Sequence, residues 1–85
     1  MKFTLTSLPA ADDDLMRIFM HSSDGDSITH ASHWIDKQLE DDPLKKVTPV
    51  DDHYFLRCGP LLVLCRISVD DRLVTIVEFR STEEI

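Results

Sequence analysis

The hydrophobic pattern changes its period once along the chain, near Pro43. Before this residue, apolar side chains recur every three or four positions, and after it they form short runs and alternations typical of strands. Residues 2–6 also alternate polar and apolar side chains, which predicts a half-buried strand ahead of the helical part. The pattern therefore predicts a strand, two helices and a group of strands, in one small domain that spans residues 1–85.

The first helix is expected to begin near Ser7 or Leu8, with Pro9 in its first turn. Three aspartates follow at residues 12–14, where carboxylates favour the positive end of the helix dipole. The helix should end near His21, because a Ser-Ser-Asp-Gly cluster comes next. Its buried stripe is expected to comprise Ala11, Leu15, Ile18 and Phe19.

The second helix is expected over about residues 27–40, with Asp26 or Ser27 as its N-cap. It should end before Pro43, which disfavours a helical conformation in the residue before it. Its buried stripe is expected to comprise Ile28, Ala31, Ile35 and Leu39, with Trp34 at the edge. The short connection between the helices predicts an antiparallel helical hairpin.

Three strands and a weaker fourth are expected after Pro43. The weak segment, residues 47–50, contains Pro49 and is either an edge strand or no strand. Residues 53–57 form a stronger strand. Residues 61–69 form a long one, whose unbroken apolar stretch indicates burial on both faces and a central place in the sheet. Asp70-Asp71 forms the turn to the last strand, residues 72–79, which completes an antiparallel sheet of three or four strands.

The charge is distributed unevenly. Residues 1–44 carry three basic and nine acidic side chains, a net of −6, whereas residues 45–85 carry six basic and seven acidic ones, a net of −1. An anion-binding surface must therefore come from the second half, and long-range attraction of the whole molecule to nucleic acid is excluded. Cys58 and Cys65 do not form a C-x-x-C motif and are expected to be reduced. No apolar segment is long enough for a signal peptide or a membrane span.

Three segments resemble the RelE/ParE superfamily of bacterial type II toxins. The first two match the family's helices, and the third matches its sheet hairpin; they are LPAADDDLMRIF, ITHASHWIDKQLEDDPL and FLRCGPLLVLCRISVDDRLVTIVEF. The resemblance implies an α+β fold, with an N-terminal strand and a two-helix antiparallel hairpin packed on a three- to four-stranded antiparallel sheet. It also implies a cytoplasmic toxin that inhibits growth, takes part in plasmid stabilisation and is neutralised by a cognate antitoxin.

Two activities are known in this family, and the resemblance leaves open whether the protein is an enzyme. RelE-like members cleave mRNA on the ribosome with basic residues and a Tyr or His, whereas ParE-like members block DNA gyrase without nuclease chemistry. Where many members have an arginine and a tyrosine in the central strand, this chain has Leu62 and Cys65. Where RelE-like members have a basic and aromatic C-terminal end, it has residues 79–85, of which only Arg80 is basic. These departures favour a ParE-like protein, and they also permit a degenerate toxin-like module without activity.

RNA cleavage would need charge stabilisation and proton transfer. The candidate residues for charge are Arg80, Arg66 and Arg57, and those for proton transfer are His53 and Tyr54. Strand alternation places Arg66 with Leu62, Leu64 and Ser68, and Arg80 with Val74, Ile76 and Glu78. An ion pair between Arg66 and Glu78 is expected across the hairpin, and it makes Arg66 an ordinary sheet residue.

We expect no metal site and no cofactor. Asp26, His30 and His33 share one face of the second helix, but Lys37 continues that face and would repel a cation, so the face is expected to be solvated. The expected partners are a cognate antitoxin and either DNA gyrase or the ribosome. A homodimer, formed through the sheet edge or the exposed side of the helical hairpin, is a further option.

Overall fold

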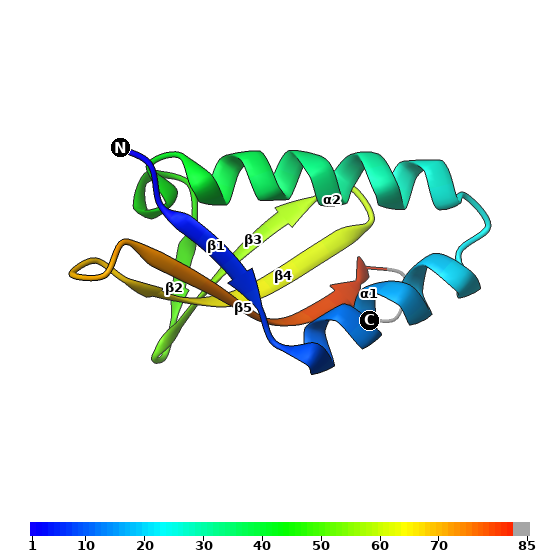
Figure 1. The fold of residues 1–85 in the computed structure, drawn as a ribbon. Coiled ribbons are helices and arrows are strands. Elements are labelled where there is room, and N and C mark those ends of the chain that lie inside the picture. Colours follow the sequence, from blue (N-terminus) through cyan, green and yellow to red (C-terminus); the bar gives the residue numbers. More distant parts are fainter. Residues whose placement is uncertain (83–85) are drawn as a thin grey trace.

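The computed structural model describes residues 1–82, which form one α+β domain (Figure 1). The elements follow the predicted order: β1 (Thr4–Ser7), α1 (Pro9–His21), α2 (Gly25–Glu40), a 3₁₀ turn η1 (Pro43–Lys45), β2 (Thr48–Val50), β3 (His53–Cys58), β4 (Leu61–Ser68) and β5 (Leu73–Ser81). Glu83, Glu84 and Ile85, the last residues of the segment 79–85 compared with the RelE-like C-terminal end, lie outside the described residues. Neither helix of the described part is both long and apolar enough to cross a lipid bilayer.

All five strands belong to one sheet, in the order β1-β5-β4-β3-β2. Strands β2 to β5 pair antiparallel, which confirms the predicted sheet, and the weak segment around Pro49 is its edge strand. Strand β1 pairs parallel to β5 at the opposite edge, with Thr4 opposite Leu73 and Ser7 opposite Ile76. The N-terminal strand therefore extends the sheet beside the last strand, far from it in sequence (Figure 1).

Helix α1 begins and ends as predicted, but α2 begins two residues earlier than expected. Its N-cap is Asp24, not Asp26 or Ser27: the Asp24 carboxylate accepts hydrogen bonds from the Ser27 backbone N–H (3.2 Å) and the Ser27 hydroxyl (2.6 Å). These hydrogen bonds lower the pKa of the Asp24 carboxyl below its usual value. The cap thus lies inside the Ser-Ser-Asp-Gly turn, so the interhelical connection is only residues 22–24.

The hydrophobic core lies between the two helices and one face of the sheet. Helix α2 presents its predicted stripe to the core, and all four residues are buried. The sheet contributes alternate residues of its central strands, among them Leu61, Val63, Cys65, Val74 and Ile76. In α1 the stripe is narrower than predicted: Ala11 and Ile18 are buried, whereas Phe19 is 47% exposed, so its assignment to the core was wrong. Phe19 lies instead against Gly25, at the start of α2.

A β-bulge in β5 changes which of its side chains share a face. Leu64 lies opposite Glu78 and Cys65 opposite Ile76, so Val77 has no partner in the register. Val74 and Ile76 are therefore buried in the core, while Glu78 and Arg80 lie on the other face. The prediction that Arg80 shares a face with Val74 and Ile76 was wrong, because simple alternation does not hold across the extra residue.

The second face of the sheet, here called the open face, has no helix on it within residues 1–82 (Figure 1). Strand β4 is central, as predicted, but its expected burial on both faces was wrong. Leu61, Val63 and Cys65 point into the core and are fully buried, whereas Leu62 and Leu64 on the open face are only half-buried. The unbroken apolar run thus supplies two surfaces, one covered by the helices and one open to solvent.

Candidate functional site

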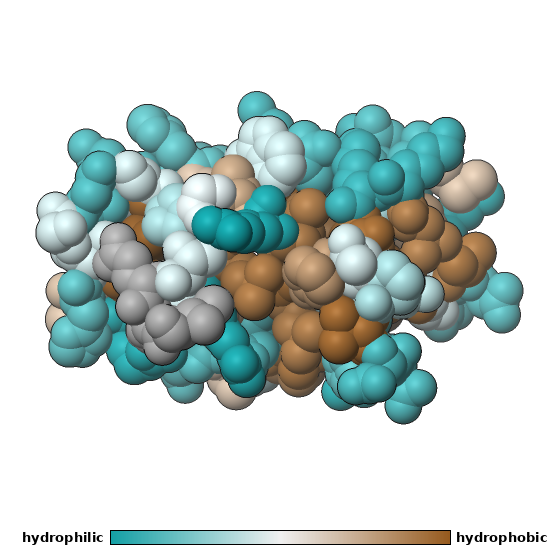
Figure 2. Space-filling view, turned by 180° about the vertical axis from the view of Figure 1, so that it is seen from behind, coloured by the Kyte–Doolittle hydropathy of each residue, from teal (hydrophilic) through white to brown (hydrophobic). Residues whose placement is uncertain are grey.

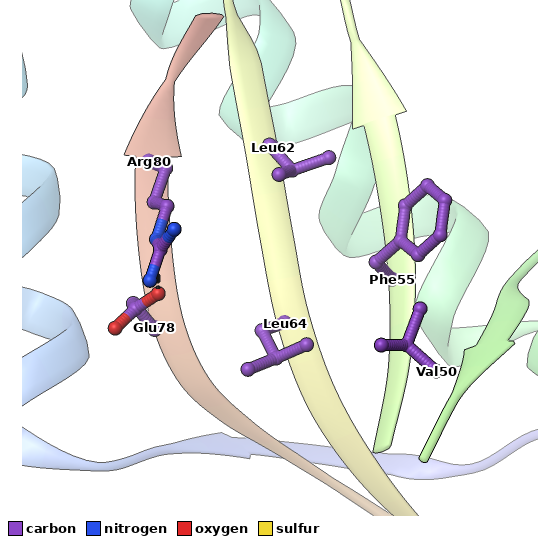
Figure 3. A pocket seen from close by; sticks show the side chains of 6 residues that line it. All are labelled: Val50, Phe55, Leu62, Leu64, Glu78 and Arg80. Atoms are coloured by element: carbon purple, nitrogen blue, oxygen red, sulfur yellow. Dashed lines mark hydrogen bonds and ion pairs between the residues drawn. The ribbon is translucent and has the colours of Figure 1, made fainter. Parts of the chain in front are cut away.

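A hollow of about 320 Å³ lies in the middle of the open face (Figure 3). It is lined by one residue of β2, one of β3 and two each of β4 and β5: Val50, Phe55, Leu62, Leu64, Glu78 and Arg80. Four of these side chains are apolar, and the two polar ones lie together along the β5 side (Figure 3). The hollow is therefore an apolar site with one polar wall.

The strand register arranges these side chains in two rows that cross the sheet. In one row, Leu62 lies between Arg57 on β3 and Arg80 on β5. In the next, Leu64 lies between Phe55 and Glu78. The rows are two residues apart along the strands, or about 7 Å. The polar and charged groups thus frame a centre made of two leucines.

The charge of Arg80 is already paired. Its Nε donates to the Glu78 carboxylate, and both side chains lie along the β5 wall of the hollow (Figure 3). The Arg80 side chain is 64% exposed, so this ion pair contributes little to stability, but it neutralises the local charge. The predicted pair between Arg66 and Glu78 was wrong, because the bulge places Thr75 opposite Arg66 and Leu64 opposite Glu78.

The four residues proposed from the sequence as a catalytic group all lie on the open face, but they do not form one cluster. Arg57 and Arg80 flank Leu62. Arg66 follows Leu62 by four residues in β4, about 13 Å along the strand, and His53 is at the far end of β3. The row that contains Leu64 and the Glu78 carboxylate lies between these two groups. A phosphate there would meet apolar side chains and a negative charge rather than convergent donors.

Tyr54 and Cys65 lie on the opposite, core-facing side of the sheet. Tyr54 packs against the core, as expected of a sheet aromatic. Cys65 is fully buried, and burial raises the pKa of its thiol to about 11, so the thiolate is not formed near neutral pH. Both cysteines are free thiols, as predicted. Of the two central-strand positions that depart from the family pattern, only Leu62 therefore faces the hollow.

The sequence pattern did not predict that four apolar residues make most of the hollow, although Leu62 was noted as a departure from the family pattern. Leu62 and Leu64 were assigned to a doubly covered strand, and Val50 and Phe55 were not singled out. The signal that could have found them is the unbroken apolar run next to a short edge strand that contains Pro49. Seen from behind, the molecule shows a continuous hydrophobic area in the middle of its surface, bordered by hydrophilic side chains (Figure 2).

The helix face considered for a metal carries exposed side chains at Asp26, His30 and His33. Within residues 1–82, no three His, Cys, Asp or Glu side chains lie close enough together to hold a metal ion. The hollow on the open face of the sheet is therefore the candidate site described here.

These features define a small α+β domain whose helices cover one face of a mainly antiparallel sheet and whose other face is an apolar strip edged by arginines. No protein-family model matches the sequence, and no curated protein matches it. Solved structures do match the fold, and three of them come from toxin–antitoxin systems.

A chain of the toxin–antitoxin complex RelBE2 from Mycobacterium tuberculosis superimposes with a TM-score of 0.79 and 18% identity, over 95% of this chain and 92% of that one. The chromosomal ParDE system from P. aeruginosa gives a TM-score of 0.69 and 14% identity, over 94% and 96% of the two chains. The archaeal RelE-RelB complex from Pyrococcus horikoshii gives 0.68 and 14%, over the full length of both. The chain therefore has the RelE/ParE fold, as the sequence resemblance implied.

Proposed function

We propose that the protein is the toxin component of a type II toxin–antitoxin module, which inhibits growth by binding a cellular target and is neutralised by a cognate antitoxin. The observation that carries this proposal is the RelE/ParE fold, matched over nearly the whole chain, combined with an open apolar face. A domain of this size gains little stability from solvent-exposed leucines, whereas a partner can bury them. The neighbours in toxin–antitoxin complexes support an antitoxin as that partner.

The target is proposed to be a protein such as DNA gyrase, bound in the bacterial cytoplasm, and not mRNA on the ribosome. Three observations support this choice. The chain has a formal net charge of −7, which opposes binding to an RNA-lined site. Arg80 is paired with Glu78, and Arg66 is separated from the other two arginines by Leu64 and its row. Such a module contributes to plasmid stabilisation when its genes are carried on a plasmid.

The antitoxin is proposed to place an apolar side chain in the hollow. The four apolar walls exclude water from such a side chain, and each fully buried Leu or Phe contributes about 1.5–3 kcal/mol. The Glu78–Arg80 pair leaves little net charge on the polar wall, so an acidic segment gains little there. The proposed segment is therefore apolar or weakly basic.

Inducible expression in a bacterial host without the neighbouring genes tests the toxin proposal. Colony counts are expected to fall on induction, and co-expression of the adjacent small reading frame is expected to restore them. Leu64→Glu places a charge in the hollow and should abolish both toxicity and antitoxin binding. Val69→Glu is the matched control, since Val69 is apolar, 56% exposed and at the β4–β5 turn, away from the hollow.

Purified protein distinguishes the mechanisms. Inhibition of gyrase-catalysed DNA supercoiling, without mRNA cleavage on translating ribosomes, is the expected result. Ribosome-dependent cleavage that is lost in Arg80→Ala would contradict the proposed target and show a RelE-type nuclease. Normal colony counts at confirmed expression of folded protein would contradict the toxin proposal, and would favour the toxin-like module without activity.

A further inference from the structure

The open face has two middle rows of side chains that share an apolar centre and carry opposite charges at one end. Both rows have a leucine on β4, which is Leu62 in the first row and Leu64 in the second (Figure 3). At the β5 end, the first row has Arg80 and the second has Glu78. This arrangement makes the face complementary to a copy of itself in which the two rows have changed places.

A two-fold axis that runs across the strands, midway between the two rows, produces this exchange when two copies face each other. The first row of each copy then lies on the second row of the other, with β4 over β4. Leu62 of each copy meets Leu64 of the other, and Arg80 of each copy meets Glu78 of the other. One symmetry operation therefore matches both the apolar and the charged positions, and it does so twice.

The β3 end of the two rows adds a third match. Arg57 closes the first row there, and Phe55 closes the second. The same axis places the Arg57 guanidinium over the Phe55 ring of the other copy, where the negative face of the ring attracts a cation. Arg57 is exposed and forms no hydrogen bond or ion pair within residues 1–82, so no existing contact there has to break first.

The Glu78–Arg80 ion pair can be shared by two copies without being broken. In one copy, Nε of the guanidinium donates to the Glu78 carboxylate, and its terminal N–H groups form no hydrogen bond within residues 1–82. In the facing arrangement these groups donate to Glu78 of the other copy, which gives an alternating ring of two arginines and two glutamates. Charge-assisted hydrogen bonds of this kind strengthen when the second copy excludes water from them.

The helical side of the molecule offers no comparable match to a second copy. Residues 1–44, which form both helices, carry a net charge of −6. Burial, together with the nearby Glu40, raises the pKa of the half-buried Asp36 carboxyl, and His33 acts in the opposite direction. A second acidic surface beside Asp36 would raise the cost of that charge further. In the facing arrangement the helices stay on the two outer sides, across the core from the contact (Figure 1).

We propose that the open face binds the open face of a second copy of this chain, in a symmetric dimer that covers both hollows. Strands β2 to β5 present a face about 19 Å wide, and the eight residues of β4 make it about 26 Å long. Two such faces bury about 1,000 Å² in total, which is at the low end of specific interfaces. We therefore expect a reversible dimer with a dissociation constant on the order of 10 µM.

The dimer covers the surface that the antitoxin and the cellular target are proposed to bind. This consequence rests on the proposed toxin function, whereas the dimer itself rests only on the register and charges of the open face. A second copy thus competes with the antitoxin and with the target for one surface. Protein that accumulates without its antitoxin is therefore held partly inactive as the dimer.

Sedimentation equilibrium of the purified protein tests the dimer. Between about 1 and 300 µM, the wild-type protein is expected to change from monomer to dimer, with a midpoint at roughly 10 µM. Leu64→Glu places a carboxylate against the leucine of the other copy and should keep the protein monomeric at every concentration. Val69→Glu adds the same charge to an exposed apolar residue at the β4–β5 turn, outside the two rows, and should leave the dimer unchanged.

Charge exchange tests the predicted contact between Arg80 and Glu78. Arg80→Glu and Glu78→Arg each place like charges opposite each other, so each variant alone should dimerise at least tenfold more weakly. An equimolar mixture of the two variants should form a heterodimer at least as stable as the wild-type dimer, because acidic side chains then face basic ones. Bulk attraction does not produce this result: each substitution changes the net charge of −7 by only two units, so both variants stay negative.

Circular dichroism shows whether each variant is folded. Wild-type protein that stays monomeric at about 300 µM would overturn the proposal. A dimer that Leu64→Glu leaves intact would overturn it as well, as would a mixture of the two charge variants that stays monomeric. These experiments measure association and not toxicity, so failure of the dimer and failure of the proposed toxin function are seen separately.

Discussion

Two neighbouring leucines in β4 provide a direct test of the one-sided core. Leu61 is fully buried under the helices, and Leu62 is half-buried on the open face. Both lie in the ladders that β4 forms with β3 and β5, so Leu61→Ala and Leu62→Ala remove the same atoms from the same central strand. The change in strand propensity is the same in both variants, so it cancels when they are compared. The difference between their losses of unfolding free energy therefore reflects the burial of each side chain.

The two substitutions should differ severalfold in cost. A buried Leu→Ala change loses the transfer free energy of the side chain and leaves a cavity, which together amount to about 3–5 kcal/mol. Leu62 has no layer above it, so its removal leaves no closed cavity and should cost about 1 kcal/mol. A domain of this length is stable by roughly 4–13 kcal/mol, so Leu61→Ala removes a large share of the total.

Urea unfolding followed by far-ultraviolet circular dichroism measures the difference. With a slope of about 1 kcal/mol per molar urea for a domain of this size, the midpoint should fall by about 3–5 M in Leu61→Ala and by about 1 M in Leu62→Ala. The slope itself should not change. Equal midpoint shifts at several protein concentrations would refute the one-sided core, because they would mean that Leu62 is covered as completely as Leu61.

Three further predictions concern single side chains. In the native protein, iodoacetamide at pH 8 should modify the half-buried Cys58 and leave Cys65 unmodified, whereas both thiols should react in urea. Mass spectrometry measures the labelling. Rapid labelling of Cys65 in the native protein would contradict its burial and its thiol pKa of about 11. Gly59→Ala should cost about 1 kcal/mol in urea unfolding, since Gly59 has a φ of +54° and no atom within 4 Å of an added Cβ, so only backbone strain acts. Asp36→Asn should raise the midpoint of thermal unfolding at pH 7: the folded-state pKa of Asp36 lies above 3.8, so its ionisation costs stability as the pH rises through that pKa. The gain should shrink below pH 4, and a gain that is constant between pH 3 and 7 would show that the carboxyl does not carry it.

The order and type of the elements could be predicted from the sequence, because each is specified by local signals. Helix α2 has a complete apolar stripe, Pro9 and Pro43 mark helix boundaries, and Pro49 marks an edge strand. The start of α2 was misplaced because Asp24 and Asp26 are both good capping residues, and only the backbone geometry of the turn selects between them.

The pairing of β1 and the bulge in β5 could not be predicted in the same way. A short strand can join either edge of a sheet, and the parallel pairing of β1 with β5 joins segments almost seventy residues apart in sequence. The hydrophobic pattern of β5 fits a regular pairing with β4 as well as the observed pairing, in which Val77 is the extra residue of a bulge. Its effect is decisive for the candidate site, because it moves Glu78 and Arg80 to the open face and pairs them there.

The open face itself shows why an apolar run does not determine how it is buried. Helices can cover both faces of a strand, or they can cover one face while a partner protein covers the other. Both strands need apolar residues at successive positions, so their sequences have the same composition. The short edge strand with Pro49 makes pairing with a further strand unfavourable, so a partner is expected to lie across the face and not along the edge. The formal charge of −7 lies mainly in the half of the chain that forms the helices, which opposes association of copies through that side. The apolar surface of the open face therefore favours association there, and the acidic charge of the helices disfavours association of two copies through them.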